Sequence, residues 1–228
     1  MALLAPVGGV LASDANSLIW WGWVGRHLPL IGSALVQHLV LTGTALGLGL
    51  VISLPLALLA RRYRWTQAPI LTVSGLLYTV PSLALFFLLG PFTGYASRTT
   101  AVIALTSYTL LILIRNVVAG LDGVPAEVIE AARGMGYAPL RLLLTVELPL
   151  ALPAIVAGIR IATVTTIGLV NVAAIIGQPG LGALITDGLR RSFPTPLMVG
   201  AILAIALAVL ADLLIAGAQR LLTPWRPR

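Results

Sequence analysis

Three ionisable side chains interrupt long apolar runs of the sequence: Arg115, Arg160 and Asp212. A charge inside a membrane span is costly, so such residues are usually paired or face a polar pathway. At about 1.5 Å of rise per helical residue, all three lie ~22 to 24 Å below the outer end of their runs. The shared depth predicts one polar cluster near the cytoplasmic side, which either pairs Asp212 with an arginine or acts as a gate.

Other reactive combinations are missing from the sequence. The chain has no cysteine, and its two histidines, His27 and His38, have few carboxylates near them and are expected at the outer membrane interface. The serines have no neighbouring His and Asp partners that would make a hydrolase triad. The glycine-rich stretch "GQPGLG" at 177–182 lacks the Lys-Ser/Thr ending of a phosphate-binding loop, and the chain has no lysine. We therefore expect no catalytic residue, no metal and no cofactor bound by this chain, which is not an enzyme.

The composition is that of an integral membrane protein. Of 228 residues, 59% are hydrophobic and 9% are charged, whereas soluble domains carry about 25% charged residues. The apolar runs are continuous rather than alternating, which favours helices over the strands of a barrel. We expect an all-α fold with about five transmembrane helices, at 36–60, 68–90, 100–121, 150–176 and 197–218, and room for a short sixth helix before residue 35. Pro55 and Pro81 are expected to kink the first two of these spans.

The arginines predict the orientation of these spans. All 14 basic residues are arginine, and the larger group flanks one side: Arg61, Arg62, Arg64, Arg133, Arg141, Arg220, Arg226 and Arg228. The positive-inside rule places this side in the cytoplasm, with the N-terminus outside and the C-terminus inside. The single domain then consists of an external or interfacial segment 1–35, the transmembrane region 36–218 with a cytoplasmic segment 122–149, and a cytoplasmic tail 219–228. The net charge of +7 is explained by this asymmetry and does not indicate nucleic-acid binding.

The cytoplasmic segment 122–149 is more elaborate than a simple connection. Pro125 suits the first turn of a helix, and Gly134 and Gly136 are expected to end or bend that helix. Pro139 can begin a second short helix before Pro149 opens the next span. Ala131 and Ala132 would leave the backbone accessible to another protein, although an amphipathic helix resting on the membrane is an equally good interpretation from the residues alone.

The spacing within this segment resembles the EAA signature of permease subunits of ABC importers. Glu130-Ala131-Ala132 is followed after three residues by Gly136, and nine residues later by Val146-x-Leu148-Pro149. The family pattern has Ile where this chain has Val146. The stretches "LLYTVPSLALFFLLG", "LIRNVVAGLDGVPAEVIEAARGMG" and "IIGQPGLGALI" are most similar to permeases for betaine, carnitine and choline, which import osmoprotectants.

The resemblance implies the fold and the working partners. It implies the type I ABC importer permease fold in a bacterial or archaeal cell membrane. The EAA residues Glu130, Ala131, Ala132, Gly136, Leu148 and Pro149 would couple the chain to a dimer of a cytoplasmic ATPase, which uses ATP and Mg²⁺. A second permease copy or a paralogue, an external substrate-binding protein and membrane lipid would complete the assembly.

The resemblance also implies a function, namely import of small quaternary-ammonium osmoprotectants such as glycine betaine, choline or carnitine. Aromatic faces suit a permanent cation, because a quaternary ammonium head group cannot be held by hydrogen bonds. The residues expected along the pathway are Tyr78, Pro81, Phe86, Phe87, Tyr108 and Asn171. The alternatives are a permease for an amino acid or another small polar nutrient, and a secondary transporter working alone.

Overall fold

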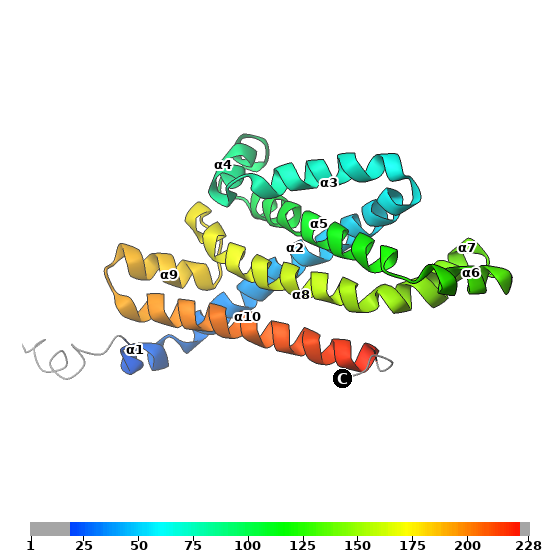
Figure 1. Ribbon diagram of the computed structural model, residues 1–228. Helices are drawn as coiled ribbons and strands as arrows, with labels where there is room; N and C mark the ends of the chain where they lie inside the picture. Colours follow the sequence, from blue (N-terminus) through cyan, green and yellow to red (C-terminus); the bar gives the residue numbers. More distant parts are fainter. Residues whose placement is uncertain (1–18, 224–228) are drawn as a thin grey trace, which may run out of the picture.

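The computed structural model describes residues 19–223, and every regular element in that part of the chain is a helix (Figure 1). Four stretches are long and apolar enough to cross a membrane, and the bent pair α3 and α4 makes a fifth if it is counted as one span. The prediction of an all-α protein with about five spans is confirmed. The predictions that fall on residues 1–18 and 224–228 lie outside the described residues.

The elements are, in order, α1 (Trp21–Arg26), α2 (Leu28–Arg62), α3 (Arg64–Thr79), α4 (Ser82–Thr93), α5 (Arg98–Asp122), α6 (Ala126–Gly134), α7 (Pro139–Leu142), a π turn (Leu143–Glu147), α8 (Leu148–Ala173), a 3-10 turn (Ala174–Ile176), α9 (Leu181–Arg190) and α10 (Pro194–Leu222). Proline opens α2, α7, α8 and α10, where its missing N–H costs nothing because the first turn has no partner for it.

The central helix of the bundle is α5, which packs between α2 and α8. Leu105, Ile114 and Leu121 on α5 are fully buried. Glycines set the close approach of α5 and α8: a Cβ on Gly158 would lie 2.4 Å from the Cβ of Asn116, and one on Gly120 would lie 2.9 Å from the Ala151 carbonyl oxygen. Such small residues let helix backbones pack tightly where lipid removes the hydrophobic driving force.

The second apolar run does not form one continuous span. Helix α3 ends at Thr79 and α4 begins at Ser82, and their axes differ by 100°. Pro81 removes a backbone N–H at the break, and the Tyr108 hydroxyl donates a hydrogen bond to the carbonyl oxygen of Val80. The span expected at 68–90 with a kink at Pro81 is therefore a pair of helices broken at that proline, and a side chain of α5 bonds a carbonyl oxygen at the bend.

The first span begins earlier than the sequence indicates. Helix α2 starts at Leu28, so the expected boundary at residue 35 falls inside it. The preceding helix, α1, has six residues and is too short to cross a membrane. It packs at the start of α10, where the Trp20 backbone N–H donates to the Thr195 hydroxyl at 2.9 Å. In the described part of the chain, no sixth span precedes residue 35.

One further expectation changes in three dimensions, and one connection between spans is helical. His38 is fully buried rather than interfacial, and its Nε2 donates to the Ile167 carbonyl oxygen at 3.2 Å. The connection between the spans expected at 150–176 and 197–218 contains helix α9, which packs along α10 (Figure 1). A Cβ on Gly182 would lie 2.5 Å from the Asn171 carbonyl oxygen. Helix α9 thus lies tightly against α8 because glycine is the residue at the contact.

Candidate functional site

Helix α6 and the short helix α7 lie together at one end of the bundle, beyond the ends of α5 and α8 (Figure 1). Pro125 precedes the first residue of α6, and Glu127 lies in the first turn, where a carboxylate favours the helix dipole. Glu130 and Ala131 are exposed, whereas Ala132 is 2% exposed and faces the rest of the chain. The EAA residues therefore present one open face, on a helix that buries one residue.

The C-terminus of α6 is closed by a glycine turn. The Tyr137 N–H donates to the Ala132 carbonyl at 3.2 Å and the Gly136 N–H donates to the Arg133 carbonyl at 2.9 Å. This pair of bonds is the Schellman arrangement, which needs a left-handed residue at the position of Gly136. Gly136 has a φ of +80°. The expectation that the glycines end this helix is confirmed, and the ending depends on Gly136.

The second part of the segment is not a separate helix as expected. From Pro139 the chain runs through α7 and a π turn directly into α8, so Leu148 and Pro149 are the first residues of the span. Both are half-buried. The helix is continuous because Pro149 lies in the first turn of α8, where proline is tolerated, and the π turn absorbs the change in hydrogen bonding.

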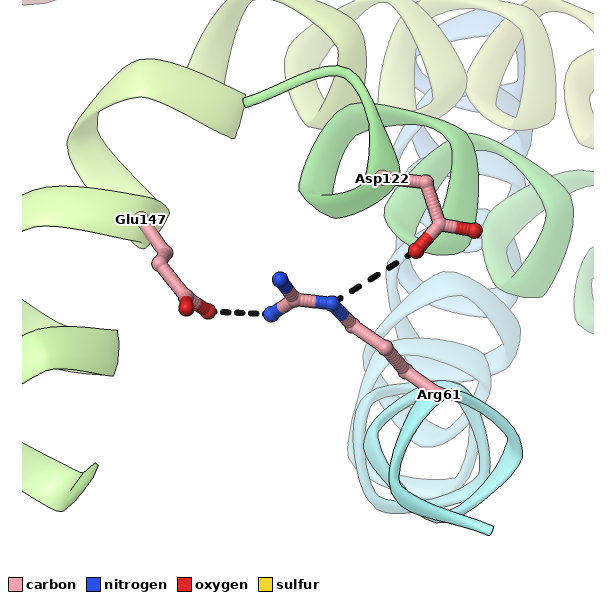
Figure 2. Close-up of polar contacts among 3 residues, drawn as sticks. All are labelled: Arg61, Asp122 and Glu147. Atoms are coloured by element: carbon pink, nitrogen blue, oxygen red, sulfur yellow. Dashed lines mark hydrogen bonds and ion pairs between the residues drawn. The ribbon is translucent and has the colours of Figure 1, made fainter. Parts of the chain in front are cut away.

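The base of this segment holds an ion-pair cluster that sequence reasoning missed. Arg61, at the end of α2, donates from Nη1 to Glu147 Oε2, and its Nε lies 3.6 Å from Asp122 Oδ1 (Figure 2). The side chain of Glu147 is 8% exposed. The available signal was a carboxylate at each end of the segment, but no spacing rule connects either of them to an arginine 61 or 86 residues earlier.

Two of the three charged residues within the spans form a pair. The guanidinium of Arg160 donates from Nε and Nη2 to the two carboxylate oxygens of Asp212, each at 2.8 Å. Such a two-pronged contact is the strongest geometry available to an arginine and a carboxylate. It fastens α8 to α10 within the membrane.

Arg115 does not join this pair. It is exposed on α5 and forms no ion pair within residues 19–223. The next residue, Asn116, contacts Gly158, so Arg115 lies near the depth of Arg160 but on another face of the bundle. The similar depth of the two arginines is consistent with the prediction, but the predicted cluster of all three residues is wrong. The position of a residue along a helix does not determine the direction of its side chain.

The expected pathway residues separate into two groups. Tyr78 and Tyr108 contact each other edge to face, with ring centroids 5.9 Å apart, beside the break at Pro81. Phe87 is exposed. Phe86 is fully buried in the core, where it packs with residues of α2, α5 and α8. Phe86 is therefore corrected to a packing residue, since adjacent residues of a helix point in different directions. Tyr108, 5% exposed, belongs to the same core cluster and is corrected with it.

Asn171 lies beneath α9 rather than on an open face. Its Nδ2 donates to the Ile167 carbonyl oxygen at 3.2 Å, the same oxygen that His38 contacts. Its Oδ1 is buried without a hydrogen-bond partner among the described residues. Within residues 19–223 no three His, Asp or Glu side chains are grouped so that they could hold a metal ion.

Known proteins with similar sequences are permease subunits of importers. Residues 30–226 match the family described as "binding-protein-dependent transport system inner membrane component". The osmoprotectant import permease protein OsmW of Salmonella typhimurium is 39% identical over 85% of this chain and 92% of its own. The choline permease OpuBB of Bacillus subtilis is 35% identical, and the glycine betaine/carnitine/choline permease OpuCB of the same organism is 32% identical, each over 82% of this chain and 86% of the relative.

Solved structures agree on the fold. The inward-facing MetNI methionine ABC transporter aligns with a TM-score of 0.76 over 87% of this chain and 98% of the solved one, at 24% identity. An amino acid ABC transporter aligns with a TM-score of 0.69 over 89% and 98%, at 20% identity. The helices, the exposed EAA segment and the match over residues 30–226 lead to one conclusion: the chain belongs to the binding-protein-dependent inner membrane components, the multi-pass permease subunits of ABC importers.

Proposed function

We propose that this permease imports small quaternary-ammonium osmoprotectants, with glycine betaine, choline and carnitine as the solutes. The observation that carries the proposal is the set of three relatives, each at least 32% identical over more than four fifths of both chains and each named for such a solute or for osmoprotectants. The amino acid alternative finds support only in structures below 25% identity, which speak for the fold alone. Membership in the family also disfavours a transporter that works alone.

The aromatic residues at the broken helix suit such a cargo. The Tyr78 and Tyr108 rings meet where the backbone of α3 ends, and Tyr78 and Phe87 keep more than a third of their surface exposed. A trimethylammonium head is held by aromatic faces and desolvation rather than by hydrogen bonds. In this proposal Tyr78, Pro81 and Phe87 border the pathway and make weak contacts, and Tyr108 supports the Tyr78 ring from the core. The external binding protein selects the solute.

The face of α5 that carries Arg115 is assigned to the interface between two permeases. An exposed arginine at this depth would be costly against lipid, and a water-filled pathway or a neighbouring permease removes that cost. The neighbour is a second copy or a paralogue.

Because the chain has no cysteine, Ala119→Cys, one turn after Arg115, gives a single thiol. A cross-link between two copies supports a homodimer, whereas a different permease that co-purifies with the active importer assigns the second position to a paralogue.

Helix α6 is the docking element for the ATPase in this proposal, with Glu130, Ala131 and Gly136 at the contact and Ala132, Leu148 and Pro149 holding the segment to the span. The ATPase dimer uses ATP and Mg²⁺ in the cytoplasm, which places the α6 end of the bundle, and with it the C-terminal end of α10, on the cytoplasmic side. The domain division proposed from the sequence is kept, with the start of the transmembrane region moved to Leu28.

The test is solute uptake by the complete importer. The permease, its ATPase and its binding protein are reconstituted in vesicles, and ATP-dependent uptake of labelled glycine betaine, choline, carnitine and a set of amino acids is measured. Uptake of at least one quaternary-ammonium solute, abolished without ATP, is the expected result. Robust uptake of an amino acid with none of the three osmolytes would refute the solute and leave the importer assignment intact.

A further inference from the structure

One arginine closes the base of the cytoplasmic segment 122–149, which carries the proposed docking helix α6 and is called the docking segment below. Asp122 is the last residue of α5 and the first of this segment, and Glu147 is the last residue of the π turn, immediately before α8. Both carboxylates face Arg61 on α2 (Figure 2). The chain segments that enter and leave α6 are therefore both bound to α2 by a single side chain. We name these three residues the Arg61 clasp.

The two halves of the clasp are unequal. The Glu147 side chain is 8% exposed and accepts a direct hydrogen bond from Arg61, whereas Asp122 is 46% exposed and lies 3.6 Å away. A buried carboxylate needs its partner, while an exposed ion pair contributes little. Glu147 is therefore the main anchor, and Asp122 an auxiliary one.

Helix α6 itself makes few contacts with the rest of the chain. Ala132 is the buried residue of α6, and α6 contacts chiefly α7 and the π turn. A cavity of about 540 Å³ lies between the end of α2 and the turn after α6, and its lining includes Leu58, Arg62, Tyr137 and Leu140. Apolar packing also reaches the clasp: Ala60 and Leu121, next to Arg61 and Asp122, lie in one core cluster, and Leu143 and Leu148 pack against it. Among the described residues, the clasp is the polar connection that joins α2 to both ends of the segment.

The π turn lies at the same joint. Its wider i→i+5 bonding interrupts the regular ladder at Leu143–Glu147, between α7 and α8. Single π turns inside helices are frequent at functional sites. A helix is more easily deformed where its regular bonding is interrupted, so the joint needs a lateral constraint if it is to transmit a displacement.

We propose that Arg61 is a transmission residue of the importer. By holding Glu147, and more weakly Asp122, against α2, it makes the docking segment and α2 move together when the ATPase displaces α6. This rests on the proposed docking of the ATPase at α6. Arg61 touches neither solute nor nucleotide in this scheme, and its role is to position the segment and to convey its motion.

The test is the ratio of solute imported to ATP hydrolysed, measured for the complete importer in vesicles at matched amounts of assembled complex. Arg61→Gln and Glu147→Gln should lower this ratio by about fivefold or more, the range of a typical coupling energy. Asp122→Asn should have a smaller effect, because its contact is longer and exposed. The matched control is Arg62→Gln, which removes the same charge from the neighbouring exposed position, where the guanidinium lies over the Tyr63 ring, and it should leave the ratio unchanged.

Two double variants separate transmission from folding. Arg61→Met with Glu147→Met replaces the pair by apolar side chains, a change that often leaves stability intact; the complex should assemble, retain ATPase activity and lose coupling. Arg61→Glu with Glu147→Arg, which reverses the ion pair, should restore part of the coupling. A wild-type ratio in the Met pair overturns the proposal. So does loss of insertion or of ATPase association in that variant, which would make the clasp a folding or docking element.

The docking assignment has its own readout. If Glu130→Lys leaves ATPase association and transport intact, the proposed role of α6 fails, whatever the Arg61 variants do. If Glu130→Lys disrupts association while the Arg61 and Glu147 variants assemble and couple normally, the transmission proposal alone fails.

Discussion

Gly136 offers a test of whether backbone conformation, rather than side-chain size, shapes the docking segment. Its φ is +80°, and a Cβ placed there would meet nothing within 4 Å. The cost of a side chain is therefore conformational, about 1–2 kcal/mol for an L-residue in the left-handed region. Such a cost reduces the fraction of chains with the closed turn by about 5- to 30-fold. Gly136→Ala should weaken ATPase association by a factor in this range.

The ranking of different Gly136 substitutions shows whether the cost is due to the backbone conformation or to the size of the side chain. Asparagine adopts the left-handed conformation more readily than alanine, and β-branched valine adopts it least. Association measured by titrating the ATPase onto the permease in nanodiscs should fall in the order Gly, Asn, Ala, Val. The matched control is Gly134→Ala, two residues away in the helix, also with open space around it and without a positive φ; it should be neutral or slightly favourable. An Asn variant weaker than the Ala variant, or equal losses at both glycines, would refute the reasoning.

Three further outcomes are expected. Asp212→Asn should lower the amount of inserted permease because it leaves the Arg160 guanidinium without its partner, and neutralising Arg160 as well should restore part of the loss; strictly additive losses would contradict a functional pair. Gly182→Ala should lower the melting temperature in detergent, since its Cβ would lie 2.5 Å from a backbone oxygen and overpacking typically costs about 1–3 kcal/mol, whereas Gly43→Ala, with open space, should not. The purified chain alone should not hydrolyse ATP, and activity free of other subunits would refute the assignment.

Local chemistry made the docking segment predictable. Pro125 precedes α6, Gly136 closes it, and proline opens the span that follows, and each of these effects acts within a few residues. The same holds for the spans, because 20 or so apolar residues without charge have no stable alternative to a helix in lipid. Where the prediction failed within this region, as with the continuous helix from Pro139, the deciding feature was the π turn, which has no sequence signature.

Side-chain direction was not predictable. Phe86 and Phe87 are neighbours with the same chemistry, yet one is in the core and the other is exposed. Arg115 and Arg160 were placed at one depth, but only Arg160 meets Asp212. A continuous apolar run gives no amphipathic pattern from which to read a face, because both lipid and core accept the same residues.

The sequence by itself determined the class of protein, the number of spans to within one, and the position and ending of α6, because hydropathy, proline and glycine act locally. The tertiary structure alone decided the size of the break after α3, 100°, the burial of His38 and the Arg61 clasp. The clasp joins residues 61 and 86 positions apart in the chain, and the contact of Tyr108 with Val80 spans 28. Such contacts depend on how α2, α5 and α8 pack, and helix packing in a membrane is set by close steric fit at positions such as Gly120 and Gly158 rather than by any periodic signal along the chain.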